Sequence, residues 1–349
     1  MRAFIPIFRS CASRHQTRAS YNRSITQCFI CPQSRHFVHT ETRLSLTTPR
    51  QYFVNKKRPL HKMTGNKLSG GAKGTIKTHI THLPSFGTVA TVTISRPDKL
   101  NALNSHLLVA LPTTLLHITD TNANLLAIVL TGEGSKAFVG GADIAEMSAL
   151  SSPAEARAFI TRVHEACQSI RDCPVPVIAR VNGIALGAGL EIVASCDIRI
   201  ASSTAVLGMP EVRMGVPSVV EAALLPGLIG WGRTRQLLLL GDTISANEAL
   251  QWGLVEKVVE PDTIDQAITK WVGSLEHNGP ESVKNQKLLM RKWEQLGIDA
   301  AIEAGIDHFG RAFESPFRAE AGATTPEPEP VRMMGDFLRR QAEKRINKL

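Results

Sequence analysis

The middle of the chain alternates between strand and helix patterns. Ala90, Val92 and Ile94 recur with the period of two that is typical of a strand, and leucines at helical spacing over 101–118 predict a helix. The short apolar run 125–130, followed by a Thr-Gly pair, predicts a buried strand. This order of strand, helix and strand predicts an α/β protein.

The alternation continues further along the chain. Apolar residues alternate over 175–181 and again over 196–201, which predicts two strands, and the segment 187–195 between them is predicted to be helical. Two more helix starts are indicated by the Ser-Pro pair within 151–155 and by the capping box 245–248. These signals concern architecture and carry no chemistry of their own.

The pattern becomes almost wholly helical after Thr263. The segment 321–330, rich in proline, interrupts it because no helix could contain this stretch, and a last helix is predicted over 331–345. We therefore expect a β/α core over 75–260 and a helical region over 261–349.

Charge is distributed unevenly along the chain. The formal net charge is +9, but residues 1–74 hold nine Arg, five Lys and one acidic residue, which leaves 26 basic and 30 acidic residues for 75–349. The part expected to fold is thus mildly acidic, which argues against a nucleic-acid partner. An RNA-binding protein, suggested by the basic N-terminal segment alone, stays open as an alternative of another class.

The Arg-rich segment 1–74 has no hydrophobic periodicity and is typical of an organellar presequence without a fold of its own. Within it, 35–40 resembles a mitochondrial processing site, and Met63 offers a second start of translation. At the other end, Asn347-Lys348-Leu349 resembles the peroxisomal Ser-Lys-Leu address. A mitochondrial location is expected, with the peroxisome as the alternative.

Several classes of protein receive no support from the sequence. No stretch reaches 18 apolar residues, so no membrane-spanning helix is predicted. The six cysteines are scattered, and the CxxC formed by Cys28 and Cys31 lacks a second pair and nearby histidines at ligand spacing. Neither a disulfide framework nor a metal site is predicted.

Two glycine-rich turns, 138–144 and 182–191, are candidate sites. Each follows a predicted strand and opens a helix, where backbone N–H groups have no partner within the helix and can bind an anion. An enolate oxygen needs two converging donors, and two turns could supply them. Glu191 and Glu211 stand beside these turns, although nothing in the residues themselves pairs them.

Four short motifs occur in one order along the chain: SRPDKLNAL at 95–103, GGADI at 140–144, NGxxxGxGxE at 182–191 and Gly-Met-Pro-Glu at 208–211. In this order and approximate spacing they resemble the enoyl-CoA hydratase/isomerase (crotonase) family over residues 85–260. The resemblance implies an α/β fold with a crotonase-like ββα spiral core, followed by a helical C-terminal region that makes trimer and CoA contacts.

The resemblance also implies roles for single residues. Gly140 and Ala188 match the positions whose backbone N–H groups form the family's oxyanion hole. Glu211 matches the carboxyl that delivers a proton to the α-carbon, and Glu191 the one that deprotonates the water attacking the β-carbon. Two acids favour hydration of a 2-enoyl-CoA, or dehydration of a 3-hydroxyacyl-CoA. One acid usually suffices for a Δ3,Δ2-enoyl-CoA isomerase, which is the closest alternative.

Substrate contacts are implied in the same way. Lys99 and Ala102 lie where the family holds the adenine and pantetheine of CoA. The other implied substrate-binding residues are Gly141, Ala142, Asp143, Ile144, Gly187, Pro210 and Ser218. Because CoA is part of the substrate, no cofactor and no metal are implied, and the family implies a homotrimer or a hexamer.

The chain departs from the family pattern after Glu211. Most hydratases of the family carry Pro-Gly-Ala-Gly-Gly-Thr where this chain has PSVVEA at 217–222. Two bulkier valines and a third acid, Glu221, alter the acyl pocket, so the sequence leaves the acyl group open. Such variants resemble members that act on branched substrates such as mevalonyl-CoA.

Overall fold

The computed structural model describes residues 73–84, 87–314 and 327–346. The predicted presequence up to residue 72 and the C-terminal tripeptide lie outside the described residues. Among the residues that are described, no helix is long and apolar enough to cross a membrane.

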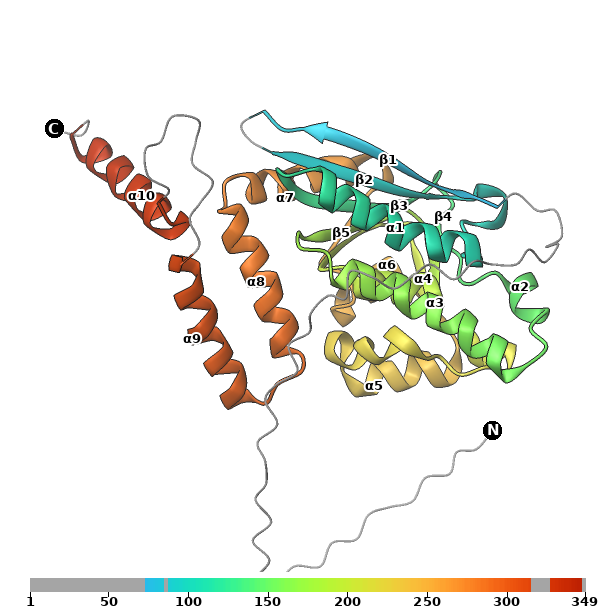
Figure 1. Cartoon of the computed structure of the whole chain (residues 1–349). Coiled ribbons are helices and arrows are strands. Elements are labelled where there is room, and N and C mark those ends of the chain that lie inside the picture. The colour runs from blue at the N-terminus through green and yellow to red at the C-terminus, as the bar shows by residue number, and fades with distance from the viewer. Residues whose placement is uncertain (1–72, 85–86, 315–326, 347–349) are drawn as a thin grey trace, which may run out of the picture. The chain divides into compact units, whose positions relative to one another are not determined.

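A six-stranded sheet runs through the β/α core in the order β1-β2-β3-β5-β7-β10 (Figure 1). Its first two strands pair antiparallel, and all the other neighbours pair parallel. The strands are β1 (Thr75–His82), β2 (Thr88–Ser95), β3 (Leu125–Gly132), β5 (Val177–Val181), β7 (Ile198–Ser202) and β10 (Lys257–Val259).

Helices cover both faces of this sheet, which explains why its central strands are almost wholly apolar. Val92 and Ile128 point to one face, where they pack with α1 (Ser105–Thr121) and α3 (Pro153–Arg171). Their neighbours in sequence, such as Val129, point to the other face and pack with α7 (Ile264–Glu276). The period of two read from the sequence therefore separates two apolar clusters.

A second, four-stranded sheet has the order β4-β6-β8-β9. Its strands are β4 (Ala137–Val139), β6 (Ile184–Leu186), β8 (Val206–Gly208) and β9 (Thr243–Ser245). The first three are parallel. The GGADI turn follows β4, the motif at 182–191 contains β6 and the turn after it, and the Gly-Met-Pro-Glu motif begins at the last residue of β8. Because the carboxyl ends of parallel strands meet at one edge, this sheet brings both glycine-rich turns and Glu211 together.

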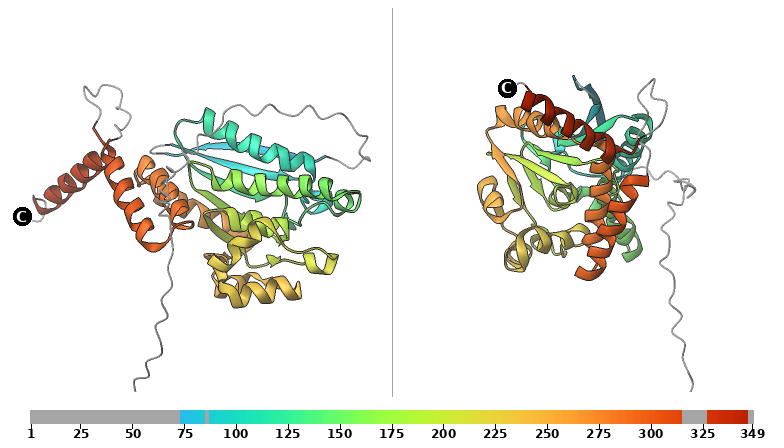
Figure 2. Two further views of the ribbon diagram at one scale, coloured as in Figure 1. Left: turned by 60° about the horizontal axis from the view of Figure 1, so that its bottom comes forward. Right: turned by 90° about the vertical axis from the view of Figure 1, so that its left-hand side faces the viewer.

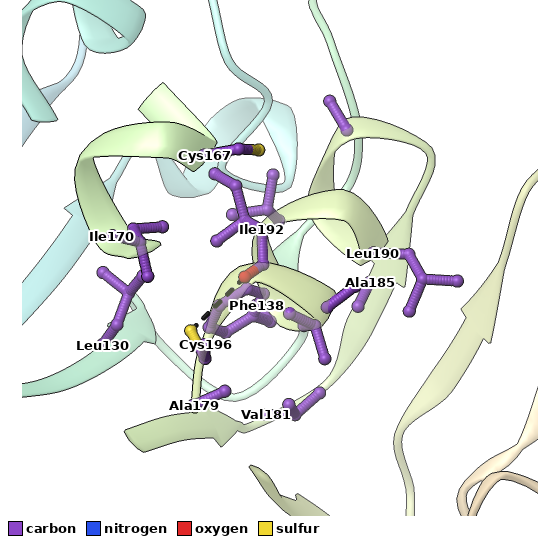
Figure 3. Close-up of a cluster of buried hydrophobic side chains, with 14 of the residues drawn as sticks. Leu130, Phe138, Cys167, Ile170, Ala179, Val181, Ala185, Leu190, Ile192 and Cys196 are labelled. Carbon is purple, nitrogen blue, oxygen red and sulfur yellow. Dashed lines mark hydrogen bonds between the residues drawn. The ribbon is translucent and has the colours of Figure 1, made fainter. Parts of the chain in front are cut away.

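The helix α4 (Ala188–Ser195), which follows the second turn, is buried over its whole length. Figure 3 shows Ile192 of this helix near Cys167 and Phe138, while Leu190 points to another side, and all four belong to the buried apolar cluster. The neighbouring Cys196 donates from its thiol to the carbonyl of Ile192 at 3.3 Å. A helix packed on all sides holds its first turn rigidly, which is what a site built from backbone groups requires.

Further helices and 3₁₀ turns connect these layers. They are η1 (Pro97–Lys99), α2 (Ile144–Ser148), η2 (Glu211–Met214), η3 (Val220–Leu224), α5 (Leu225–Leu240), α6 (Ala246–Trp252) and η4 (Pro261–Thr263), where η denotes a 3₁₀ helix. The predicted capping box is confirmed, because Ser245 and Glu248 each accept from the other's backbone N–H at the start of α6. The cap predicted for α3 is confirmed as well, with Ser152 accepting from a first-turn amide.

Three helices close the chain: α8 (Pro280–Trp293), α9 (Ile298–Glu314) and α10 (Glu329–Ile346), which Figure 2 shows in two further views. Lys287 of α8 ties this region to the core, since its buried ammonium pairs with Asp197 at 2.7 Å. The last helix, predicted over 331–345, begins two residues earlier, because Glu329 and Pro330 already belong to α10. Proline is tolerated there since the first turn of a helix needs no N–H donor.

Candidate functional site

The first glycine-rich turn is held in place by the motif at 95–103. Asn101 is buried in a left-handed conformation with φ 57°, and its side chain accepts from the backbone N–H of Arg96 at 2.9 Å. The same amide donates to the carbonyls of Glu133 and Ala137. This one side chain therefore fixes the loop against the strand that leads into the turn.

The role predicted for Gly140 is wrong. Its N–H donates to the carbonyl of Leu100 at 2.8 Å, which follows from the left-handed conformation of Leu100 with φ 51°. An N–H that already donates at this short distance is not available to donate to a substrate oxygen.

The amide of Ala142 replaces it as the candidate donor. On either side of it, the carbonyl of Gly141 accepts from Leu103 and the N–H of Asp143 donates to Leu103, both at 2.8 Å. Successive N–H groups of extended backbone point to opposite sides, so the N–H of Ala142 points away from Leu103. No hydrogen bond from it occurs in the part of the chain that the structure describes.

The second turn supplies the other donor. The N–H of Gly187 is used, because it donates to the carbonyl of Gly208 at 2.9 Å. The next residue, Ala188, begins α4, so its N–H has no acceptor within the helix, and the described residues offer none elsewhere. The two turns approach closely, since a Cβ added to Gly141 would lie 3.2 Å from the carbonyl oxygen of Leu186.

Glu211 lies directly against the second turn. A Cβ added to Gly187 would stand 2.6 Å from Oε1 of Glu211, and Gly187 has a φ of +52°, which favours glycine. The other carboxylate oxygen accepts from the hydroxyl of Ser218 at 2.9 Å. Gly187 and Ser218 thus position this carboxyl beside the turn that carries the free amide of Ala188.

Glu191, the second carboxyl of the site, is buried, with 3% of its surface exposed. Burial, followed by the negative charges of Glu211 and Glu221, raises the pKa of Glu191 to about 8, although a hydrogen bond from the Ala222 N–H opposes the shift. That N–H lies 3.3 Å from Oε1 of Glu191. A carboxyl with this pKa exists in both protonation states near neutral pH, so it can accept or donate a proton.

The residues predicted to contact CoA and the acyl group differ in their exposure and in their hydrogen bonds. Lys99 is exposed, and the carbonyl of Ala102 already accepts from the Arg96 guanidinium at 3.2 Å. Ile144 exposes 61% of its surface at the start of α2, whereas Pro210, just before Glu211, is half-buried.

Asp143 has a structural task. Burial would raise its pKa, but the hydrogen bond from Arg96 and those from the Glu146 and Ala145 amides outweigh it and lower the pKa. Its side chain caps α2 by accepting from the Ala145 amide at 2.9 Å and from the Glu146 amide at 3.1 Å. Asp143 therefore holds the first turn, and it is not free to bind substrate through its carboxylate.

Sequence reasoning missed one contact beside Glu191. Oε1 of Glu221, the third acid, lies 2.8 Å from Nδ1 of His164 on α3. The two residues are 57 positions apart on different elements, and no spacing in the sequence links them.

Comparison with known proteins identifies the family of this chain. A family model described as enoyl-CoA hydratase/isomerase matches residues 86–322. The short-chain-enoyl-CoA hydratase of Clostridium acetobutylicum is 40% identical over 240 residues, which cover 68% of this chain and 91% of that protein. The crotonyl-CoA hydratase of Syntrophomonas wolfei is 39% identical over 233 residues, 66% of this chain and 89% of that protein.

Solved structures show the same fold. The enoyl-CoA hydratase of Bacillus anthracis superimposes with a TM-score of 0.64 at 30% identity, covering 69% of this chain and 92% of that one. The predicted crotonase-like fold is thereby confirmed. With the matched family model and relatives of this similarity, the chain belongs to the enoyl-CoA hydratase/isomerase family.

Proposed function

We propose that this protein is an enoyl-CoA hydratase whose oxyanion hole is formed by the N–H groups of Ala142 and Ala188. One observation carries the proposal: two unpaired backbone donors on adjoining turns lie next to two carboxyls, Glu191 and Glu211. Two donors aimed at a thioester oxygen stabilise the enolate that forms when water adds at the β-carbon. The relatives named as hydratases support the same reaction.

The two carboxyls complete the proton transfers. Glu191, in its ionised form, takes a proton from water as the oxygen bonds to the β-carbon, while Glu211 donates a proton to the α-carbon. The dehydration of a 3-hydroxyacyl-CoA runs the same steps backwards, with Glu191 protonating the leaving hydroxyl. The amides and carboxyls supply every charge and proton that the reaction needs, so we propose that it uses no cofactor.

The test is an assay of the purified protein with straight and branched enoyl-CoAs, including 3-enoyl isomers. Glu191→Gln and Glu211→Gln should each lower hydration by about 10²- to 10⁴-fold, the range for one acid–base group. Double-bond migration in a 3-enoyl-CoA should depend on Glu211 more than on Glu191. If Glu191→Gln hydrates as fast as the unmodified protein, the role assigned to Glu191 fails. If the unmodified protein moves the double bond of a 3-enoyl-CoA but adds no water, an isomerase becomes the better assignment.

We also propose a homo-oligomer, a trimer or hexamer. One face of α9 carries a stripe of exposed apolar side chains, while Ala301 and His308 on its other side are buried. The stripe consists of Ile298, Ile302, Ile306, Phe309 and Phe313, which are 38–74% exposed. An exposed apolar stripe of this length is typical of a surface that a protein partner covers.

Light scattering measures the assembly directly. The double substitution Ile302→Asp and Ile306→Asp should lower the molar mass of the particle, because two charges in an apolar contact are costly. Glu303→Gln on the same helix is the matched control and should leave the mass unchanged. A mass equal to one chain for the unmodified protein would contradict the proposal.

For the location we propose mitochondria, supported by the Arg-rich N-terminal segment. Fluorescent fusions at either end distinguish the alternatives, because an N-terminal tag masks a presequence and a C-terminal tag masks a peroxisomal address. A C-terminal fusion that enters mitochondria supports the proposal, and an N-terminal fusion found in peroxisomes contradicts it.

A further inference from the structure

The two carboxylate oxygens of Glu211 have different surroundings. Oε2 accepts from the hydroxyl of Ser218 at 2.9 Å, whereas Oε1 lies against Gly187, where an added Cβ would stand 2.6 Å from it. Among the described residues, Oε1 has no hydrogen-bond donor. The hydroxyl thus occupies one oxygen and leaves the other beside the turn that carries the amide of Ala188.

The backbone between the two residues keeps Ser218 close to Glu211. The N–H of Val216 donates to the carbonyl of Glu211 at 3.2 Å and closes a tight turn. An ion pair between Arg213 and Asp242 joins the same turn to the chain that follows α5. Ser218 stands two residues after Val216, so its hydroxyl reaches the carboxyl from a constrained position.

The hydroxyl of Ser218 is a departure from the family pattern. That pattern has Pro-Gly-Ala-Gly-Gly-Thr where this chain has 217–222, so glycine stands at the position of Ser218. Glycine has no side chain and cannot donate to a carboxylate through one. The contact with Glu211 therefore goes beyond what the family pattern requires.

Hydration and double-bond migration make different demands on Glu211. In hydration the carboxyl gives one proton to the α-carbon: its O–H bond breaks and a C–H bond forms. In the migration of a 3-enoyl double bond it takes a proton from the α-carbon and returns it to the γ-carbon. A carboxyl held at one oxygen suits the first demand, because a fixed group transfers a proton to one carbon effectively. The second demand favours a carboxyl that can move between two carbons.

We propose that Ser218 is a positioning residue that holds Glu211 at the α-carbon and thereby favours the addition of water over migration of the double bond. The inference rests on the proposed function and assigns to Ser218 a part in selecting the reaction. The hydroxyl acts through Oε2 of Glu211, so that Oε1 is left to release the proton.

The experiment compares hydration of a 2-enoyl-CoA with migration in a 3-enoyl-CoA, on the full chain. Ser218→Ala removes the hydroxyl, and kcat of hydration should fall by about 10- to 100-fold with little change in KM, as expected for a misplaced catalytic group. Migration should fall much less, so the ratio of migration to hydration should rise by at least about tenfold. Ser218→Gly should behave like Ser218→Ala, whereas Ser218→Thr keeps the hydroxyl and should restore the ratio.

The matched control is Ser274→Ala on α7. It removes an exposed hydroxyl that donates to a carbonyl of its own helix, and it should leave both rates in place. Equal falls of the two reactions in Ser218→Ala and Ser218→Gly overturn the inference, because loss of a contact that only supports the fold weakens both alike. An unchanged rate of hydration overturns it as well.

A second measurement does not depend on the addition of water. Butyryl-CoA in D₂O exchanges its α-hydrogens when Glu211 removes and returns protons at the α-carbon, and proton NMR follows the exchange. It should slow by about 10- to 100-fold in Ser218→Ala and recover in Ser218→Thr.

The exchange separates the two proposals. If the unmodified protein exchanges these hydrogens but adds no water to an enoyl-CoA, the proposed function fails while the exchange still decides on Ser218. If it adds water and the exchange is as fast in Ser218→Ala, the inference alone fails.

Discussion

The contribution of one backbone N–H donor to catalysis can be measured by changing Ala188. It is the first residue of α4, a position where a helix accepts proline, as Pro153 and Pro280 show at the starts of α3 and α8. Ala188→Pro therefore removes the N–H and leaves the helix in place. With one of two oxyanion donors lost, the barrier should rise by about 2.7–4 kcal/mol, which is roughly 10²- to 10³-fold in kcat.

The assay is steady-state hydration of crotonyl-CoA, with a thermal melt of each variant. The effect should fall on kcat more than on KM, because the amide binds the enolate more strongly than the ground-state thioester. Ala188→Ser keeps the N–H at nearly the same size and is the control. If Ala188→Pro melts like the control and its kcat lies within about tenfold of it, the reasoning about this donor is refuted.

Two further predictions concern stability. The pKa of Glu191 is raised from 4.5 to about 8, so the stability it contributes is complete below pH 4.5 and is lost as the pH rises towards 8. Because Gln cannot ionise, the melting temperature of Glu191→Gln should rise relative to that of the unmodified protein as the pH increases from 5 to 8. A difference between the two melting temperatures that does not change with pH would contradict this. Lys287→Met removes the buried ammonium that binds Asp197 and the carbonyls of Ile170 and Val175. The free energy of unfolding, measured in urea, should fall by about 3 kcal/mol. This is near the low end of the range for breaking a buried ion pair, because Asp197 is partly exposed. A fall of less than about 1 kcal/mol would contradict the prediction.

Local signals in the sequence predicted local structure well. The caps at Ser152 and Ser245 are confirmed because they involve residues only three positions apart. The helix expected from residue 101 begins at Ser105 instead, since Asn101 takes a left-handed conformation and Asn104 provides the cap. The strands of the second sheet are only three residues long, which is too short for a period of two to be recognised.

The site itself depends on contacts that no local pattern contains. Glu191 and Glu211 come together because β6 and β8 are neighbours in a sheet that the sequence did not reveal. Gly140 was chosen by its place in a motif, yet the conformation of Leu100 decides that its amide is paired and leaves Ala142 as the donor. The contact between His164 and Glu221 likewise arises from the packing of α3 on η3.

A crystal structure with bound butyryl-CoA, a saturated thioester that cannot add water, tests the central claim most directly. The thioester oxygen should lie about 2.7–3.1 Å from the backbone nitrogens of both Ala142 and Ala188, with the α-carbon facing Glu211 and the β-carbon facing Glu191. A thioester oxygen bound elsewhere, or an acyl chain with both glutamates on its far side, would contradict the account.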